Sequence, residues 1–283
     1  MIEIRTLEGV SPEQLADTFN RAFTGYFVPI QMTEALVRDK MLSEQTRLAY
    51  SAGAFYGSQL VGMLLQGKGH YDGADCAYNG GTGVFPEFRG QNLTARMYEF
   101  LLPRLQESGV QKCLLEVITE NAQAIHVYQK IGFKINRQFD CFRGLVNAPK
   151  QAISSAYYVR VNPHELPWHI FSNFGNALPS WPYTLEAAQR ILHLLSSVTI
   201  YQENECIAFG LINKSTGRIF QFGVHPDHRR KGIGYHLFHQ LSQLTTRGLS
   251  ILNIDSTDQA TILFLRHIGF EKYIGQYEMQ WEL

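Results

Sequence analysis

The chain has 283 residues, of which 45% are hydrophobic and 18% are charged. This composition is typical of a soluble globular protein with a substantial core, and the length favours two domains. Lys plus Arg and Asp plus Glu both total 25, so charge gives no reason to expect nucleic acid or an anionic membrane as a partner. No apolar run approaches the roughly 18 residues of a membrane span, and the N-terminal sequence lacks the order of a secretory signal.

The four cysteines, Cys76, Cys113, Cys141 and Cys206, are far apart in the sequence and show no C-x-x-C spacing. Such cysteines are typical of an intracellular protein without a disulfide framework. We therefore expect a cytoplasmic protein with reduced, mostly buried thiols.

In chain order, the first half alternates strand-like and helix-like segments. Ser11-Pro12-Glu13-Gln14 provides an N-cap, a first-turn proline and a glutamine at the third helical position, ahead of a helix that ends near Ala22. The glycine-containing segment 53–57 lies between two apolar runs and predicts a hairpin turn. The predicted strands are 2–7, 46–51, 59–66, 75–84, 112–118 and 133–145, and the other predicted helices are 32–42, 93–105 and 122–131.

Residues 146–155 are small and polar with one proline, which predicts a domain boundary. We therefore expect an N-terminal domain at 1–148 and a C-terminal domain at 155–283. The second half repeats the order of the first, and the mixture predicts an α/β (α+β) fold in which each domain is a mixed, mostly antiparallel sheet flanked by helices. Its predicted strands are 156–161, 198–202, 205–212, 218–224, 250–255 and 271–281, and its predicted helices are 185–195, 233–244 and 259–268.

Two segments are copies of one motif, in which valine, proline and arginine recur at the same relative positions. They read Gly83-Val84-Phe85-Pro86-Glu87-Phe88-Arg89-Gly90-Gln91-Asn92-Leu93-Thr94 and Gly223-Val224-His225-Pro226-Asp227-His228-Arg229-Arg230-Lys231-Gly232-Ile233-Gly234. Farther on, Ile131-Gly132-Phe133 recurs as Ile268-Gly269-Phe270, at nearly the same separation. Copies this far apart indicate a duplicated domain rather than a solenoid, whose repeats are typically ~20–50 residues long.

A strand that leads through Arg-x-x-Gly-x-Gly into a helix is suited to binding phosphate. Backbone N–H groups of the turn and of the first helical turn point to one place, and the helix dipole favours negative charge there. Small residues allow the close approach of a diphosphate, as Gly232 and Gly234 do in the second copy, and Arg229, Arg230 and Lys231 add positive charge.

The pattern Val-x-Pro-x-x-Arg-x-x-Gly-x-Gly resembles the acetyl-CoA-binding motif of the GCN5-related N-acetyltransferase (GNAT) superfamily. The later residues Leu115-Glu116-Val117, Asn121, Ala124, Tyr128 and Gly132-Phe133 resemble that family's second conserved segment. The resemblance covers nearly the whole chain as two tandem domains. It implies two central strands that separate to take up the pantetheine arm of acetyl-CoA, with the strand end bonded to the arm and the loop amides bonded to the pyrophosphate.

The binding residues that the resemblance implies lie in both copies. The first copy departs from the pattern at Asn92 and Thr94, which replace two small residues; asparagine is the non-glycine residue that most readily adopts unusual backbone angles, so binding there remains expected. The second copy keeps both glycines, which can also persist simply as a good strand-to-helix turn. The candidates are Gly83, Val84, Arg89, Gly90, Gln91, Asn92, Leu93, Thr94 and Asn121 in the first copy and Val224, Arg229, Arg230, Lys231, Gly232, Ile233 and Gly234 in the second.

Acetyl transfer to an amine needs a base for the ammonium proton and an acid for the leaving thiolate, each typically worth ~10²–10⁴-fold in rate. In the family's protein N-terminal acetyltransferases, which this pattern resembles, a Leu-Glu-Val glutamate is the base and a tyrosine twelve residues later is the acid. Glu116 and Tyr128 have this spacing, whereas their equivalents in the second half, aligned by pairing Gly132 with Gly269, are Asn253 and Leu265. The first domain is therefore the better catalytic candidate. Glu116 as a solvent-facing or ion-paired carboxylate and Tyr128 as a core aromatic remain the alternatives.

The resemblance thus implies an acetyl-CoA-dependent N-acetyltransferase that acts on a primary amine of a small molecule or on a peptide N-terminus. The alternatives are that the second domain holds acetyl-CoA, or that the protein is a non-catalytic CoA-binding sensor or scaffold. No metal is expected: His225, His228, His236 and His239 surround the second loop, and a solvated cluster is the simpler interpretation. We expect a small amine as the acceptor and neither nucleic acid nor a membrane as a partner. The protein is expected to be a monomer or a homodimer.

Overall fold

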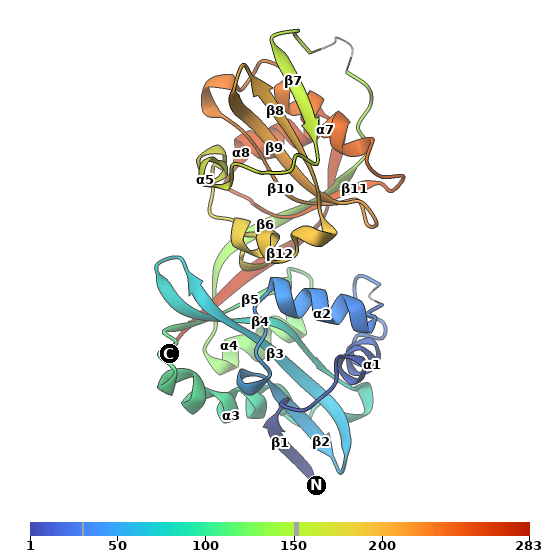
Figure 1. Ribbon diagram of the computed structural model, residues 1–283. Coiled ribbons are helices and arrows are strands. Elements are labelled where there is room, and N and C mark those ends of the chain that lie inside the picture. The colour runs from blue at the N-terminus through green and yellow to red at the C-terminus, as the bar shows by residue number, and fades with distance from the viewer. Residues whose placement is uncertain (30, 150–152) are drawn as a thin grey trace. The chain divides into compact units, whose positions relative to one another are not determined.

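The structure, a computed structural model, describes residues 1–29, 31–149 and 153–283. It divides into two compact units (Figure 1). Unit 1 comprises Met1–Asn136 and Tyr277–Leu283, and unit 2 comprises Arg137–Gln276. The segment predicted as the domain boundary, 146–155, includes residues 150–152, which lie outside the described residues.

Unit 1 is a mixed, mostly antiparallel sheet with helices on both faces, as predicted. Its strands follow the order β1-β2-β3-β4-β5, with β12 (Phe270–Glu282) beside β5. Neighbouring strands from β1 to β4 are antiparallel, and β4 and β5 are parallel. The elements are β1 (Ile2–Thr6), α1 (Pro12–Ala22), α2 (Glu34–Ser43), β2 (Ala52–Tyr56), β3 (Gln59–Tyr71), β4 (Ala74–Val84), α3 (Leu93–Glu107), β5 (Lys112–Ile118), α4 (Ala122–Ile131) and the start of β6 (Lys134–Gly144).

The apolar faces of the four helices determine which side of the unit 1 sheet each one covers. Phe19 of α1 and Val37 of α2 are buried in one cluster. Met97 of α3 and Tyr128 of α4 are buried in a second cluster on the opposite side. We call these two sides the α1/α2 face and the α3/α4 face.

Unit 2 repeats this arrangement. Its strands follow the order β6-β11-β10-β9-β8-β7, with β12 (Phe270–Glu282) on the other side of β6. The pair β10–β11 is parallel, and the pairs β6–β11, β9–β10, β8–β9 and β7–β8 are antiparallel. The elements are β7 (Tyr157–Val161), α5 (Trp168–Phe171), α6 (Leu185–Arg190), β8 (Ser196–Gln202), β9 (Glu205–Asn213), β10 (Arg218–Val224), α7 (Ile233–Ser242), β11 (Leu249–Asp255) and α8 (Gln259–His267).

Two strands contribute residues to both units. Most of β6 belongs to unit 2, although it follows the last helix of unit 1. The end of β12, from Tyr277 onward, belongs to unit 1. There Met279 is fully buried, and the Trp281 ring packs near Tyr98 and Phe133, with centroids 6.1 and 5.7 Å away. Unit 1 therefore needs a segment that the chain reaches only after unit 2.

Several predicted elements are confirmed and two are wrong. Ser11 caps α1 by accepting a hydrogen bond from the Gln14 amide, as predicted. The predicted strand 46–51 is instead a short 3₁₀ segment at Leu48–Tyr50, and the strand lies at Ala52–Tyr56. Gly53 lies within this strand, at a position where a Cβ would collide with three apolar side chains, whereas Gly57, with a φ of +60°, makes the turn. The predicted helix 185–195 ends at Arg190, followed by a 3₁₀ segment.

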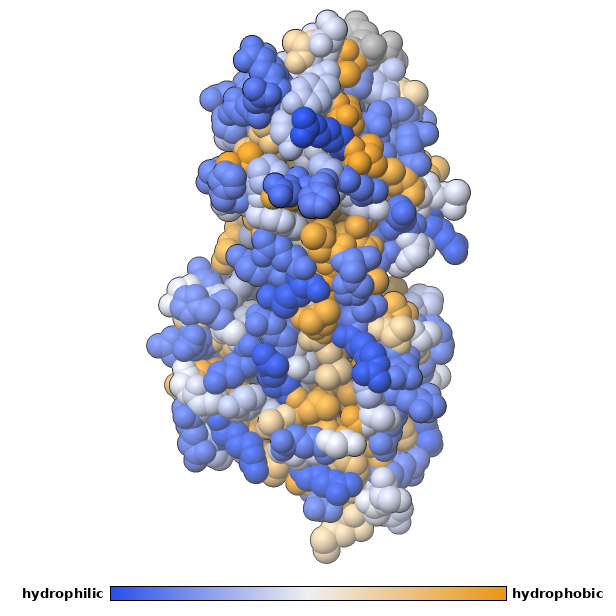
Figure 2. Space-filling view, viewed as in Figure 1, coloured by the Kyte–Doolittle hydropathy of each residue, from blue (hydrophilic) through white to orange (hydrophobic). Residues whose placement is uncertain are grey.

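The surface and the thiols agree with the composition. On the face drawn in Figure 2, hydrophilic residues cover most of both units, with apolar residues in smaller groups between them. All four cysteines lie in the described part of the chain and are buried and free of disulfides, as expected. Among the helices of that part, none has both the length and the apolar character that crossing a bilayer requires.

Candidate functional site

The centre of unit 1 is an opening between β4 and β5. The parallel pairing of these strands extends from Cys76↔Lys112 to Asn79↔Leu115, and β4 then continues to Val84. Opposite β3, the register shifts between Leu65 and Gln66, which leaves Gly80 as a bulge in β4. A bulge bends its strand, so β4 turns away from β5 at this point. This is the strand separation that the resemblance implies.

Tyr128 reaches this opening from the α3/α4 face. Burial raises the pKa of Tyr128, hydrogen bonds with the Thr82 and Asn79 side chains lower it, and the neighbouring Tyr26 hydroxyl raises it. Asn79 Nδ2 in turn donates to Thr82 Oγ1 and to the Tyr98 hydroxyl, both at 2.8 Å. The Tyr128 hydroxyl is therefore buried, protonated at neutral pH and held by a polar network at the bulge, as a proton donor would need to be.

Glu116 lies on the opposite side of the opening from Tyr128. Its neighbours in β5, Leu115 and Val117, are buried in the cluster of the α3/α4 face, so by strand alternation Glu116 points to the α1/α2 face. The residue as a whole is half-buried, and the Tyr78 hydroxyl donates to Oε2 at 3.1 Å. Glu116 is thus neither a fully solvated side chain nor a core residue.

The loop after α1 lines the same opening. Burial raises the pKa of Tyr26, and a hydrogen bond with the Asn121 side chain opposes the rise. Asn121 also caps α4, because its Oδ1 accepts from the Ala124 amide at 3.1 Å. Tyr26 therefore reaches from the α1 side of unit 1 to the start of α4, beside Tyr128.

The two motif loops have the same backbone conformation. In the first, Gly90 and Asn92 have φ of +78° and +57°; in the second, Arg230 and Gly232 have φ of +63° and +80°. Each loop therefore contains two left-handed positions and uses one glycine for them. Asn92 adopts the left-handed conformation, as expected from its residue type.

Both loops present uncapped helix starts. Asn92 and Gly232 precede α3 and α7, and among the described residues no side chain caps either helix. By contrast, the helices α1, α2, α4, α6 and α8 each have a capping side chain. The free N–H groups of the first turn of α3 and α7 can accept an anion. Leu93 and Ile233 are 3% and 1% exposed, so they anchor the loops in the core and offer a ligand their backbone.

The shared position of the two motif arginines has a structural explanation. Arg89 donates to the backbone oxygens of Val84 and Ala22, at 3.2 and 2.8 Å. Arg229 donates in the same way to the oxygens of Val224 and Phe174, at 3.0 and 3.1 Å. Each arginine ties its loop to the strand end and to the preceding segment, whereas Gln91, Arg230 and Lys231 are exposed.

Unit 2 keeps the opening but fills its centre with apolar side chains. The pairing of β10 with β11 covers Arg218 and Ile219, and the bulge falls at Phe220. Phe222 and Phe238 are in edge contact, and Leu265 is fully buried with them. In the alignment of the two copies, Asn79, Gly80, Thr82, Tyr98 and Tyr128 correspond to Ile219, Phe220, Phe222, Phe238 and Leu265. The polar network of unit 1 has no counterpart in these side chains.

Asn253, the equivalent of Glu116, has a structural role. It is 6% exposed, donates to Ser180 Oγ at 2.9 Å and accepts from Gln276 Nε2 at 2.8 Å. Its φ of +58° falls where β11 shifts register against β6. A buried amide held on both sides supports a strand irregularity rather than proton transfer.

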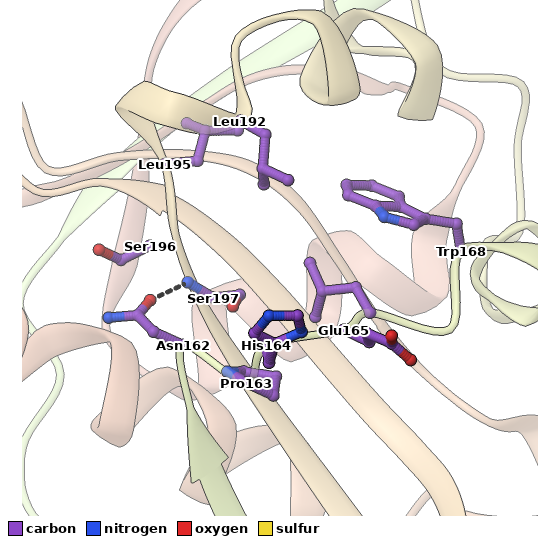
Figure 3. Close-up of a pocket in the computed structure, with 10 residues that line it drawn as sticks. Asn162, Pro163, His164, Glu165, Trp168, Leu192, Leu195, Ser196 and Ser197 are labelled. Carbon is purple, nitrogen blue, oxygen red and sulfur yellow. Dashed lines mark hydrogen bonds between the residues drawn. The ribbon is translucent and has the colours of Figure 1, made fainter.

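Two other features do not belong to either opening. Within residues 1–29, 31–149 and 153–283, no group of three or more His, Cys, Asp or Glu side chains is placed to hold a metal ion, and His225 instead contacts Phe174 and His228 through its ring. A cavity of about 520 Å³ in unit 2 lies between the β7–α5 connection and the start of β8 (Figure 3). Asn162 and Trp168 line it, and no residue of the loop 229–234 does.

Sequence reasoning missed several residues of the unit 1 opening. Tyr78, Asn79 and Thr82 were not identified, although Asn79-Gly80-Gly81-Thr82-Gly83 is unusually rich in glycine for a strand, which indicates a close approach to the backbone. Glu44 was missed as well, because nothing in its local sequence distinguishes it. The alignment of the two copies already pairs Asn79 with Ile219 and Tyr98 with Phe238, so it contained the signal that the second copy lacks the polar network.

Two units of this topology, each with strands that separate at a bulge beside an uncapped helix, define a tandem protein of the acetyltransferase fold. The profile of the acetyltransferase (GNAT) family matches residues 13–133 and 162–270. The chain therefore belongs to the GNAT family.

Solved structures show the same tandem fold. The chain is similar to a tandem GNAT protein from the clavulanic acid biosynthesis pathway, with 13% identity, a TM-score of 0.75 and coverage of 100% of this chain and 98% of that one. It is also similar to a GCN5-related N-acetyltransferase from Sphaerobacter thermophilus (14% identity, TM-score 0.70, coverage 99% and 95%) and to one from Anabaena variabilis (12%, 0.65, 99% and 72%). Comparison with curated proteins finds none that matches the sequence.

Proposed function

We propose that the chain is an acetyl-CoA-dependent N-acetyltransferase that acetylates a primary amine of a small molecule or a peptide N-terminus, with chemistry in unit 1. Family membership supports acetyl transfer in general. The observation that carries the choice of unit is the contrast between the two openings: a buried tyrosine in a polar network in unit 1, and phenylalanine and leucine at the equivalent positions of unit 2.

In this proposal, the side chains of unit 1 divide the proton transfers between the two faces of the sheet. Glu116, on the α1/α2 face, takes a proton from the acceptor's ammonium group. The neutral amine attacks the acetyl carbon to form a tetrahedral adduct, its C–S bond breaks, and Tyr128, on the α3/α4 face, donates its proton to the departing thiolate. The amide nitrogen gives up its remaining extra proton to solvent, solvent reprotonates Tyr128, and Glu116 releases its own proton to solvent. Burial favours protonated Tyr128, so the donor is ready at neutral pH.

The binding groups of unit 1 follow from the same geometry. Beyond Asn79, β4 is no longer paired with β5, which supports the proposal that the backbone of Gly83 and Val84 bonds to an extended pantetheine arm. The amides of Gly90–Thr94 receive the pyrophosphate at the uncapped start of α3. Asn121 supports this site indirectly, through the α4 cap and its bond to Tyr26.

A second proposal concerns unit 2. Its loop has the same two left-handed positions as the first and an uncapped helix start, and the side chains of Arg230 and Lys231 reach the surface beside it. We infer that unit 2 retains the capacity to bind the pyrophosphate of a CoA molecule at Arg229–Gly234 without turning it over.

Hydrogen exchange and turnover together test these assignments. Acetyl-CoA at saturation should protect the amides of residues 89–94, and protection of 229–234 would support binding in unit 2. Release of CoA should be measured with a panel of primary amines for the wild type, Glu116→Gln and Tyr128→Phe. Full activity of both variants would refute the site in unit 1, and the absence of both protection and turnover would refute the enzyme.

A further inference from the structure

Glu44, at the end of α2, lies at the opening of unit 1. Its side chain is 7% exposed, and its carboxylate occupies the space that a Cβ on Gly80 would fill. Gly80 is the bulge residue at which β4 leaves β5. The absence of a side chain at position 80 thus gives this carboxylate direct contact with the strand at the apex of the opening.

The position of Glu44 relative to the two sheet faces is defined by its neighbours. Cβ atoms on Gly81 and Gly83 would meet Phe19 and Ala22 of α1, so the glycines of β4 face the α1/α2 side. Glu44 approaches Gly80 from that side, whereas Tyr128 contacts Thr82 from the other. Glu44 and Glu116 therefore lie on one face of the opening, and the proton donor lies on the opposite face.

The charge environment of Glu44 is unusual for a surface helix. One of its partners is Lys40, one turn earlier in α2, with a side chain that is 25% exposed. Burial raises the pKa of Glu44, and the Lys40 ammonium opposes that rise. The same helix carries a pair of identical spacing, Glu34–Arg38, with side chains 49% and 61% exposed. A helix-stabilising pair thus does not require burial, and a buried ion pair adds little to stability.

We propose that Glu44 receives the ammonium group of the acceptor at the β4 bulge, so that the acceptor is a cationic primary amine that enters from the α1/α2 face. Lys40 holds the carboxylate in the empty state and moves toward solvent when the substrate's ammonium replaces it. Glu44 and Glu116 then flank the nitrogen from the β4 and β5 sides, and Glu116 takes the proton. This inference rests on the proposed function of unit 1.

Binding of a simple cation tests the inference without knowledge of the natural acceptor. The probe is n-butylammonium, titrated into the CoA-saturated protein, with n-butanol as the neutral control. We expect the wild type to bind the ammonium ion and not the alcohol, Glu44→Gln to bind it at least 10-fold more weakly, and Glu34→Gln to bind it as the wild type does. Equal binding by Glu44→Gln, or no binding by the wild type, would overturn the inference.

A second variant covers the case in which Glu44→Gln does not fold. Lys40→Met removes the competing cation, so it should bind n-butylammonium several-fold more tightly, and Arg38→Met should not. Unchanged or weaker binding by Lys40→Met would count against Glu44. If amines from the panel are acetylated, Glu44→Gln should raise the KM of the amine at least 10-fold with an unchanged KM for acetyl-CoA. If no amine is acetylated but n-butylammonium still binds in a way that depends on Glu44, the proposed enzymatic function would be refuted and the proposed ammonium site would stand.

Discussion

Asn92 and Gly232 occupy equivalent positions at the start of α3 and α7, and both adopt the left-handed conformation, with φ of +57° and +80°. Two residues earlier, both copies again have a left-handed residue, but here the first copy holds the glycine, Gly90, and the second holds Arg230. The two copies have thus kept one loop conformation while exchanging which position holds the glycine. Backbone shape, rather than side-chain identity, is the shared property of the loops.

Arg230→Gly should stabilise the protein, because an L-residue in the left-handed region costs roughly 1–2 kcal/mol and glycine does not bear that cost. We expect the free energy of unfolding to rise by about 1 kcal/mol, less the extra backbone entropy of glycine. Chemical denaturation checks the change. Lys231→Gly is the control, because Lys231 lacks a positive φ, and a gain of equal size there would contradict the explanation.

Tyr128→Phe should reduce kcat by roughly 10²–10⁴-fold, because it removes the proposed proton donor. Tyr98→Phe is the matched control: Tyr98 bonds to the same Asn79, and the equivalent residue of unit 2 is already phenylalanine. Its kcat should stay within a few-fold of the wild type. Since burial raises the pKa of Tyr128 above its ordinary value of 10.0, the wild-type rate should not fall through loss of this proton below pH 10.

Trp281→Ala should destabilise unit 1 by about 3 kcal/mol, as large-to-small substitutions of packed aromatic residues do. The Trp281 ring packs against Tyr98 and Phe133, far from it in sequence. Hydrogen exchange should show faster exchange in α3 and β5. Glu282→Ala, an exposed neighbour, should change stability by less than about 0.5 kcal/mol. Equal effects of the two variants would disprove the packing role.

The four thiols should be unreactive in the folded protein. Burial raises the pKa of Cys76 and of Cys206 to about 11, and that of Cys113 to about 12. Cys141 is also buried. Because the thiolate is the reactive form, a disulfide reagent at pH 8 should label the native protein slowly and all four thiols after denaturation. Rapid labelling of one thiol in the native state would show that its side chain is accessible.

Glu44→Gln should change the pH dependence of stability. Burial raises the pKa of Glu44 above 4.5, so the folded state binds this proton more tightly than the unfolded state. The resulting stabilisation is present below pH 4.5 and is lost as pH rises through the folded-state value. The glutamine variant lacks this loss, so its free energy of unfolding relative to the wild type should increase from pH 4 to pH 7. A constant difference would place Glu44 in a more solvated environment.

The sequence predicted the parts of the fold that depend on local patterns. Ser11 and Gln14 indicated the first helix, and the two motifs indicated strand, turn and helix in the same order in both halves. The strand 52–56 was missed because Ala52, Gly53 and Ala54 look like a turn; their small size serves tight packing, which a single sequence does not reveal. The position of Trp281 in unit 1 also has no local signal, because it depends on long-range strand pairing.

The candidate site was predicted to a similar extent. Glu116 and Tyr128 follow from a known spacing, and the structure places them on opposite faces of the opening. The polar network around Tyr128 could be inferred from the internal repeat, because the alignment of the two motif copies pairs Thr82 with Phe222. Glu44 could not be identified from the sequence. It belongs to the site because the end of α2 contacts the bulge at Gly80, and these two segments are far apart in the sequence.

The dependence of unit 1 on Tyr277–Leu283 has a consequence for biosynthesis. Domains usually fold as they leave the ribosome, N-terminal first. Here the sheet of unit 1 waits for a strand segment that is translated after all of unit 2, so Trp281 reaches Tyr98 only once both units have been made. The proposed catalytic centre beside Tyr98 would therefore mature late, and a chain whose translation stops within unit 2 would carry every proposed catalytic side chain without the packing that supports them.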